Sequence, residues 1–167
     1  MRGWLKLKLR NKVILCICLL FLIGIIFSYS ACDERKNIYN NNNKILQDWD
    51  SYKYNSRTCT GNSRDETNIK YSGFSGDDSI FILESKEDGE VTFNFDSIVN
   101  SGDFKAVLIN PQKEMENVLE GTESGNKTIK LVKGKYRFKI VGRNAKGEIS
   151  ISTNKNNYIV ITNCDGN

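Results

Sequence analysis

Alternating apolar and polar positions dominate the chain from about residue 67 onward. Val91, Phe93 and Phe95 are separated by polar residues, and Tyr136 and Phe138 follow the same two-residue period. Successive side chains of a β-strand point to opposite faces, so this period predicts strands with one face in a core and the other in solvent. Further strands are predicted at 69–74, 79–84, 104–109, 114–119, 129–131, 149–151 and 158–162.

Residues that favour turns separate these runs. The turn signals fall at 76–78, 88–89, 101–103, 110–111, 125–126, 133–134 and 146–147. Short strands at roughly ten-residue spacing are typical of antiparallel sandwiches and barrels. A parallel sheet would need a crossover of about a dozen residues after each strand, for which there is no room. The sequence therefore predicts an all-β fold, an antiparallel β-sandwich of about eight strands at 67–164.

Residues 33–66 predict a connecting segment. The stretch 33–44 is rich in asparagine and has little to bury, so we expect a solvated, flexible tether. Ile45, Trp49 and Tyr52 then recur with helical spacing, which predicts a short amphipathic helix over 43–54. Such a helix is marginal alone, so we expect it to dock on the following domain; a free recognition helix is the alternative.

The first 32 residues have the parts of an export signal. A basic, partly apolar stretch of twelve residues precedes the uncharged apolar run 13–27, and small residues follow at 28–31. Fifteen helical residues cover about 22 Å, less than the roughly 30 Å hydrocarbon core of a bilayer. Extension to Ala31 brings a true span within reach, so length alone leaves signal peptide and membrane anchor both open.

The residues Tyr29-Ser30-Ala31-Cys32 resemble the lipobox of bacterial lipoproteins, with tyrosine where leucine is usual. This resemblance implies a diacylglycerol thioether on Cys32 and attachment to the membrane through lipid. A retained membrane-spanning helix and cleavage after Ser30 with release are the alternatives. All three place residues 33–167 outside the cytoplasm, and the first two at the extracytoplasmic face of the cell membrane.

A second resemblance covers about half of the chain. Tyr71-Ser72-Gly73-Phe74-Ser75-Gly76, the run from Phe104 to Pro111 and the Gly134-Lys135-Tyr136 hairpin resemble the C-terminal β-sandwich of small, clostridial-type lipoproteins of Gram-positive bacteria. That family has no assigned biochemical activity. The resemblance therefore implies a fold and a location, and it implies no catalytic residue.

The charge distribution excludes several classes of function. The chain of 167 residues has a net charge of +4, but five of its 24 basic residues lie in the first twelve positions. The remainder carries 19 basic and 20 acidic residues, a balance that argues against nucleic acid as a partner. Histidine is absent, which removes Ser-His and Cys-His nucleophile pairs and histidine-ligated metal sites. We expect no cofactor and no metal.

Two groups of residues remain as candidates for chemistry. Cys59 and Cys164 flank the predicted strands, so a disulfide that joins the ends of the sandwich is one interpretation and two unrelated thiols the other. The acidic residues between 77 and 90 could hold calcium or act as paired carboxylates of a glycosidase, although their spacing matches no calcium loop. Solvated turns are the simpler interpretation.

These observations favour a non-enzymatic binding or accessory module at the cell envelope, with an envelope protein or a glycan as partner. A carbohydrate-binding module is the first alternative and a small surface hydrolase the second. Sugars stack on exposed aromatic rings, and in the β domain only Tyr71, Phe74 and Tyr158 are not assigned to the core by their spacing. Exposed aromatic side chains on one sheet face would favour the glycan.

Overall fold

The computed structural model describes residues 34–61, 65–154 and 157–163. The chain divides into two compact units, Met1–Glu34 and Arg35–Asn167, and the second contains nearly all of the described residues. The predicted signal or anchor, Cys32 and Cys164 lie outside the described residues. Among the residues that are described, no helix has the length and apolar character needed to cross a membrane.

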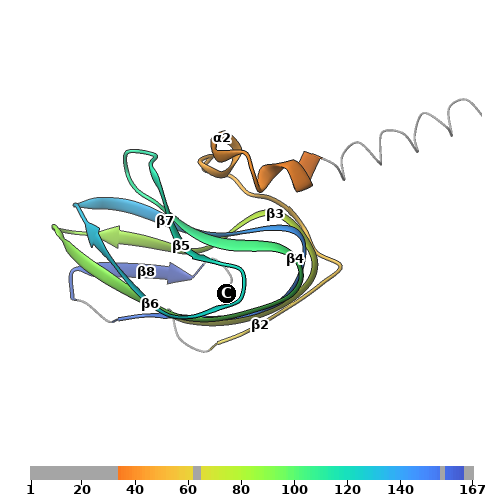
Figure 1. Cartoon of the computed structure of the whole chain (residues 1–167). Coiled ribbons are helices and arrows are strands. Elements are labelled where there is room, and N and C mark those ends of the chain that lie inside the picture. Colours follow the sequence, from red (N-terminus) through yellow and green to blue (C-terminus); the bar gives the residue numbers. More distant parts are fainter. Residues whose placement is uncertain (1–33, 62–64, 155–156, 164–167) are drawn as a thin grey trace, which may run out of the picture. The chain divides into compact units, whose positions relative to one another are not determined.

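The second unit is built from antiparallel strands (Figure 1). Over the described residues, the sheet contains eight strands, which confirms the predicted all-β class. Their order is β1-β3-β7-β4-β5, with β2 and β8 also paired to β3 and β6 to β4. The bounds are β1 Ser51–Lys53, β2 Ser56–Thr60, β3 Glu66–Ser85, β4 Gly89–Ile109, β5 Met115–Glu120, β6 Glu123–Leu131, β7 Gly134–Thr153 and β8 Ile159–Asn163.

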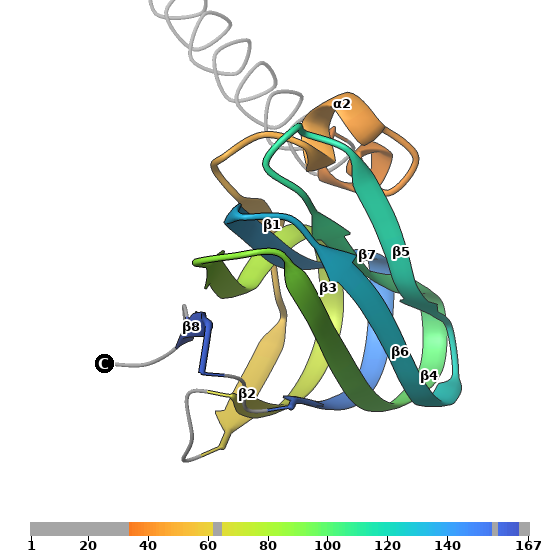
Figure 2. The same cartoon turned by 90° about the vertical axis from the view of Figure 1, so that its left-hand side faces the viewer.

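Three strands of about twenty residues each bend and so fold the sheet into two layers (Figures 1 and 2). The ladder shifts register between Tyr71 and Gly76 in β3, and between Val99 and Asp103 in β4. In β7 the bend includes Asn144, whose φ is 51°. The turns predicted at 76–78, 101–103 and 146–147 are therefore wrong, because the chain continues in the same strand through a bulge. The turn predicted at 125–126 is also wrong, because both residues lie within β6 and pair with β4.

The bends assign each half of a long strand to a different layer. In the first layer, β2 and β6 are the outer strands, on either side of the first halves of β3 and β4 and the second half of β7. In the second layer, the second halves of β3 and β4 lie on either side of the first half of β7. There, β5 borders β4, while β1 and β8 border β3.

The main core lies between the two layers. Phe93 from the first layer packs on Phe138 from the second, with ring centroids 5.0 Å apart. Tyr71 and Phe104 stack across the same space at 4.8 Å. The prediction that the in-facing aromatic residues form the core is confirmed for Phe81, Phe93, Phe95, Phe104, Tyr136 and Phe138, all of which are buried.

The flexible tether predicted at 33–44 is wrong at Ile38 and Tyr39, which pack on the outer face of the second layer. Ile38, Tyr39 and Ile45 form a second buried cluster with Val107, Ile109 and Val141. Because 106–109 is apolar at every position, β4 is buried on both faces at this end and requires a cover. The few apolar residues among the asparagines supply that cover.

The helix predicted over 43–54 is also wrong. The observed helix α2 is only Asn42–Ile45, with Asn41 as its N-cap, and of the three apolar positions used for the prediction only Ile45 is buried. After α2 the chain runs in bends through residues 46–50, hereafter the strap, and then enters β1. Trp49, at 68% exposure, and Tyr52, at 48%, face solvent.

Candidate functional site

The strap is held to the sheet by a buried lysine. Lys139 on β7 is fully buried, and its Nζ donates to the backbone oxygens of Gln47 at 2.9 Å and Trp49 at 3.2 Å. The same Nζ lies 2.6 Å from Asp77 Oδ2 and 3.1 Å from Asp50 Oδ1. The strand period predicts a solvent-facing side chain at 139, and this is wrong because the strap covers that part of the outer face.

Asp77, the buried partner of Lys139, is 2% exposed. Burial raises the pKa of its carboxyl group, and the hydrogen bond from Lys139 opposes this rise. Its second oxygen accepts a hydrogen bond from the backbone of Ser51 at 3.1 Å. Asp50 in turn accepts from the backbone and the hydroxyl of Ser79, at 3.1 and 2.8 Å. Together with the bonds of Lys139, these contacts hold the strap and the first residue of β1 on β3 and β7.

The strap forms one wall of an open groove of about 450 Å³, hereafter the basic groove. The end of β4, the turn after it and the beginning of β7 supply the other lining residues. The lining residues are Leu46, Gln47, Asp48, Ile109, Asn110, Pro111, Lys113, Lys135, Tyr136 and Arg137. Three cationic side chains and one carboxylate therefore share this space.

The charged groups of the basic groove are unequally paired. Lys113 forms an ion pair with Asp48 across the groove, and this pair, with smaller contributions from Arg137 and Lys139, lowers the pKa of the Asp48 carboxyl group. Arg137 donates from Nη1 to the Ser79 hydroxyl at 3.1 Å. No carboxylate of the described residues lies within ion-pair distance of Lys135 or Arg137.

An exposed tryptophan adjoins this groove. Trp49 directly follows Asp48, a lining residue, and its backbone is fixed by Lys139 while its side chain faces solvent. The aromatic candidates of the β domain do not provide such a surface, because Tyr71 and Phe74 are buried in the core and Tyr158 is partly buried. Sequence reasoning missed Trp49 because helical spacing assigned it to a docked face.

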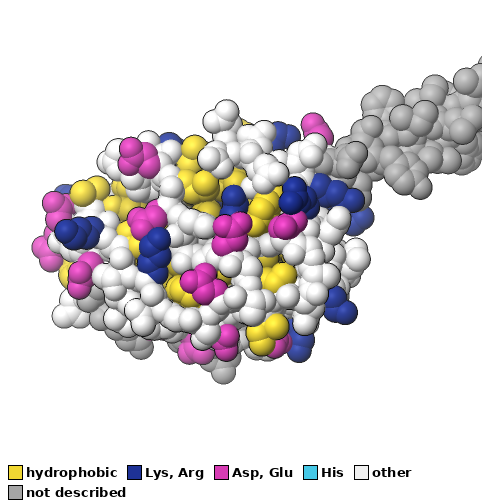
Figure 3. Space-filling view, viewed as in Figure 1, with side chains coloured by type: hydrophobic (Ala, Val, Ile, Leu, Met, Phe, Trp, Pro, Cys, Tyr) yellow, Lys and Arg dark blue, Asp and Glu magenta, His cyan; other side chains and the backbone are white. Residues whose placement is uncertain are grey.

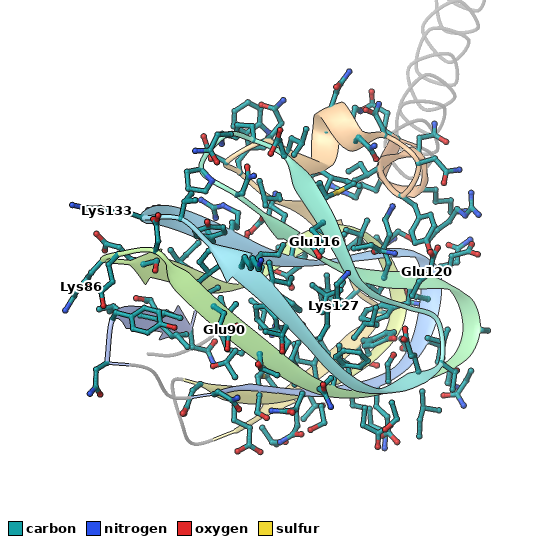
Figure 4. The ribbon with its side chains drawn as sticks, turned by 60° about the vertical axis from the view of Figure 1, so that its left-hand side comes forward. Lys86, Glu90, Glu116, Glu120, Lys127 and Lys133 are labelled. Carbon is teal, nitrogen blue, oxygen red and sulfur yellow. The ribbon has the colours of Figure 1, made fainter. Side chains whose placement is uncertain are left out.

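Two further hollows lie elsewhere on the β domain. One, of about 380 Å³, is on the outer face of the first layer, and polar residues and three isoleucines of β2, β3, β4 and β7 line it. The other, of about 490 Å³, lies between β5 and the end of β6. Near it, Glu116 on β5 pairs with Lys127 on β6 at 3.1 Å, and Figure 4 shows these two side chains between the strands. Neither hollow is lined by an exposed aromatic residue.

The acidic stretch at 77–90 does not converge on a metal site. Asp77 forms an ion pair with Lys139, and Asp78 accepts a hydrogen bond from Tyr54 at 2.7 Å. Within 34–61, 65–154 and 157–163, no group of three or more carboxylate, thiol or imidazole side chains is arranged to hold a metal ion. Acidic and basic side chains are interspersed over the face shown in Figure 3.

Cys59 is exposed on β2, with its Sγ 3.1 Å from the Thr67 hydroxyl. It lies opposite Ile69 of β3, whereas Asn163, the neighbour of Cys164 in sequence, lies opposite Phe81 of the same strand. Since Cys164 is outside the described residues, the disulfide stays a prediction. Lipid attachment at Cys32 also stays a prediction, because Cys32 lies outside the described residues.

Comparisons with known proteins give similarities of fold only. No protein-family model and no curated protein matches the sequence. Among solved structures, a family 35 carbohydrate-binding module (CBM35) of Abf62 from Cellvibrio japonicus is similar, with 13% identity and a TM-score of 0.40. The match covers 68% of this chain and 87% of that one.

The carbohydrate-binding module CBM6cm-2 of lichenase 5A from Cellvibrio mixtus, in complex with cellotriose, is 15% identical with a TM-score of 0.38. That match covers 64% of this chain and 90% of the module. A family two carbohydrate esterase from Cellvibrio japonicus is 14% identical with a TM-score of 0.34, and only 30% of its chain is covered. At such TM-scores these similarities assign neither a ligand nor an activity to this protein.

Proposed function

We propose that residues 35–167 form a non-catalytic glycan-binding module of the cell envelope, with the basic groove and Trp49 as its binding site. In this proposal the N-terminal segment attaches the module to the extracytoplasmic face of the membrane, through lipid on Cys32 or through a retained apolar helix. Contact with an envelope protein, rather than a glycan, is the competing interpretation.

One observation carries the proposal: an open groove rich in polar groups lies next to a solvent-exposed indole. Its volume of about 450 Å³ falls within the range of small-ligand sites. Sugars present hydroxyl groups around the ring and apolar C–H groups on its faces. Hydrogen-bonding groups for the sugar hydroxyls come from Asn110, Gln47 and Arg137. The exposed ring of Trp49 offers a planar surface for the apolar C–H groups.

The strap backbone is immobilised before any ligand arrives. Lys139 bonds to two carbonyl oxygens of the strap, and Asp50 bonds to Ser79 of β3. A fixed backbone lowers the entropy cost of ordering the site on binding. Trp49 projects from such a backbone, unlike an aromatic residue on a mobile loop.

The test is glycan binding by the full chain in detergent, with the wild type compared with Trp49→Ala and Trp49→Phe. We expect Trp49→Ala to weaken binding about tenfold or more, and Trp49→Phe, which keeps an aromatic ring, to recover part of the loss. Ile98→Ala is the matched control, since Ile98 is an exposed apolar residue on the first half of β4, which belongs to the other layer from the groove.

Tryptophan fluorescence gives an independent measurement, because the chain has only two tryptophans, Trp4 and Trp49. A sugar stacked on Trp49 should change its emission, and a Trp4→Phe variant isolates that signal. Glycan binding that survives Trp49→Ala unchanged would contradict the proposed site. If the wild type and Trp49→Ala both captured the same envelope protein and neither bound a glycan, the competing interpretation would be favoured.

A further inference from the structure

The basic groove differs in charge from the rest of the domain. From residue 13 onward the chain has 19 basic and 20 acidic residues, so the body as a whole is nearly neutral. The groove lining, in contrast, contains Lys113, Lys135 and Arg137 against the single acid Asp48. The lining therefore has a surplus of two positive charges, and Glu84, the acid opposite Lys135 in the ladder with β3, is not among the lining residues.

The geometry of β7 brings these charges together. Residues two apart on a strand share a face, so Lys135 and Arg137 project to the outer side of the second layer while Tyr136 between them points into the core. Their backbones are about 7 Å apart along the strand. Lys113, on the turn after β4, lines the same space.

Structural roles do not account for these side chains. Lys139, the next residue on the same face, binds Asp77, Asp50 and two carbonyl oxygens of the strap. Arg137 has one hydrogen bond, to the neutral hydroxyl of Ser79, and Lys135 is exposed. Among the described residues neither forms an ion pair, since Glu84, which lies opposite Lys135 on β3, is beyond ion-pair distance.

We infer that the ligand of the basic groove is an acidic glycan, whose carboxylate or phosphate groups bind Lys135 and Arg137. This inference rests on the proposed function and names the class of glycan. A guanidinium group recognises oxyanions through parallel N–H donors, and an ammonium group adds a mobile positive charge. The sugar ring next to the acidic group would then lie near Trp49, which directly follows the lining residue Asp48.

Asp48 limits the affinity for such a ligand. Its carboxylate neutralises Lys113 and would repel an incoming anion, and at 71% exposure its side chain has little part in the core. Asp48→Asn removes the repulsion and releases Lys113 for the ligand. The inference therefore requires one substitution in the groove that strengthens binding, alongside two that weaken it.

The experiment measures binding of the full chain to three probes of similar length: an oligogalacturonide, a glycerol-phosphate oligomer and a neutral cello-oligosaccharide. We expect at least one acidic probe to bind about tenfold more tightly than the neutral one. The probe that binds shows whether the groove recognises a carboxylate or a phosphate group. Lys135→Gln and Arg137→Gln should each weaken acidic binding about tenfold, Asp48→Asn should strengthen it, and added salt should weaken it.

Lys86→Gln is the matched control. Lys86 lies on the turn between β3 and β4, and Figure 4 shows it projecting away from the body of the domain. Equal weakening by Lys86→Gln and Lys135→Gln would mean non-specific attraction and would overturn the inference. So would failure of both acidic probes to bind. Thermal unfolding of each variant verifies that the fold is retained, and Lys135→Gln changes only an exposed side chain.

The two proposals fail in different ways. If the neutral probe binds as tightly as the acidic ones, and Lys135→Gln and Arg137→Gln change nothing while Trp49→Ala still weakens binding, the acidic glycan is wrong and the proposed function stands. If acidic binding is insensitive to every groove substitution and to Trp49→Ala, the groove is not the site and both proposals are wrong.

Discussion

Replacement of Lys139 by methionine tests how the strap and the sheet depend on each other. Methionine preserves most of the length and apolar volume of the side chain, so the substitution removes the charge and its hydrogen bonds with little change in packing. It leaves the Asp77 carboxylate buried at 2% exposure with no cation. The carbonyl oxygens of Gln47 and Trp49 also lose their donor.

Loss of one partner from a buried ion pair costs about 3–5 kcal/mol, because the remaining charge stays desolvated. The two carbonyl groups raise the cost only if the strap stays in place; release of the strap would let water reach them. We therefore expect the free energy of unfolding to fall by about 3–5 kcal/mol. For a domain of this size, that lowers the melting temperature by roughly 10–20 °C.

Urea unfolding of the wild type, Lys139→Met, Asp77→Asn and the double variant measures the coupling between the two groups. Asp77→Asn keeps an oxygen for the backbone of Ser51 but removes the charge, so the double variant should regain most of the stability lost in Lys139→Met. Lys86→Met, at an exposed position, should change stability by less than about 0.5 kcal/mol. A loss below about 1 kcal/mol in Lys139→Met, or simple additivity in the double variant, would refute this account.

The pH dependence of the same variant has a definite sign. Burial raises the pKa of Asp77, so the folded state holds this proton to higher pH than the unfolded state does. The stability that the protonated Asp77 carboxyl group contributes is fully present below its pKa in the unfolded state. It is lost as the pH rises through its pKa in the folded state. Without Lys139 the rise in pKa is larger, so the deficit of Lys139→Met should shrink between neutral pH and about pH 4. An equal deficit throughout that range would contradict the buried charge.

Further predictions concern the cover, the bend, the cysteines and the anchor. Ile45→Ala should lower the free energy of unfolding by about 2–5 kcal/mol in urea if the cover and the sheet unfold together, whereas local detachment alone would leave the main transition unchanged. Gly76→Ala should destabilise by about 2 kcal/mol or more in the same assay, since φ is +113° and the new Cβ would lie 1.9 Å from a backbone oxygen of β1. Thiol labelling under non-reducing denaturation should find Cys59 and Cys164 both protected; two labelled thiols would remove the disulfide. Labelled palmitate should be incorporated into the wild type and not into Cys32→Ala, and a wild type without label would favour a retained span.

Much of the sheet was accessible from the sequence because alternation is a local property of the chain. Phe93, Phe95, Tyr136 and Phe138 were assigned to the core correctly from the two-residue period alone. The same period could not distinguish a turn from a bulge. Gly76 and Gly102 read as turn residues in either case, and only the pairing of β3, β4 and β7 on both sides of each bend makes them parts of continuous strands.

The site was less accessible, since each of its parts depends on a contact between distant segments. Lys135, Arg137 and Lys139 have the same position in the strand pattern, yet one is exposed, one is half-buried and one is fully buried. The burial of Lys139 comes from the strap, which lies about 90 residues earlier in the chain and binds its ammonium group. Similarly, helical spacing assigned Trp49 to a packed face, but the bonds of Asp50 to Ser79 draw the chain out of the helix.

The sequence by itself determined the all-β class, the antiparallel pairing and most of the aromatic core, because these follow from the two-residue period and from connections too short for crossovers. Only the tertiary structure decided which polar side chains remain in solvent. A lysine on the outer face of a sheet can be solvent-exposed, can hold another segment in place or can bind a ligand, depending on what covers it. The covering segment comes from another part of the chain. The cations of the basic groove come from β7 and from the turn after β4, and the strap encloses them in a hollow.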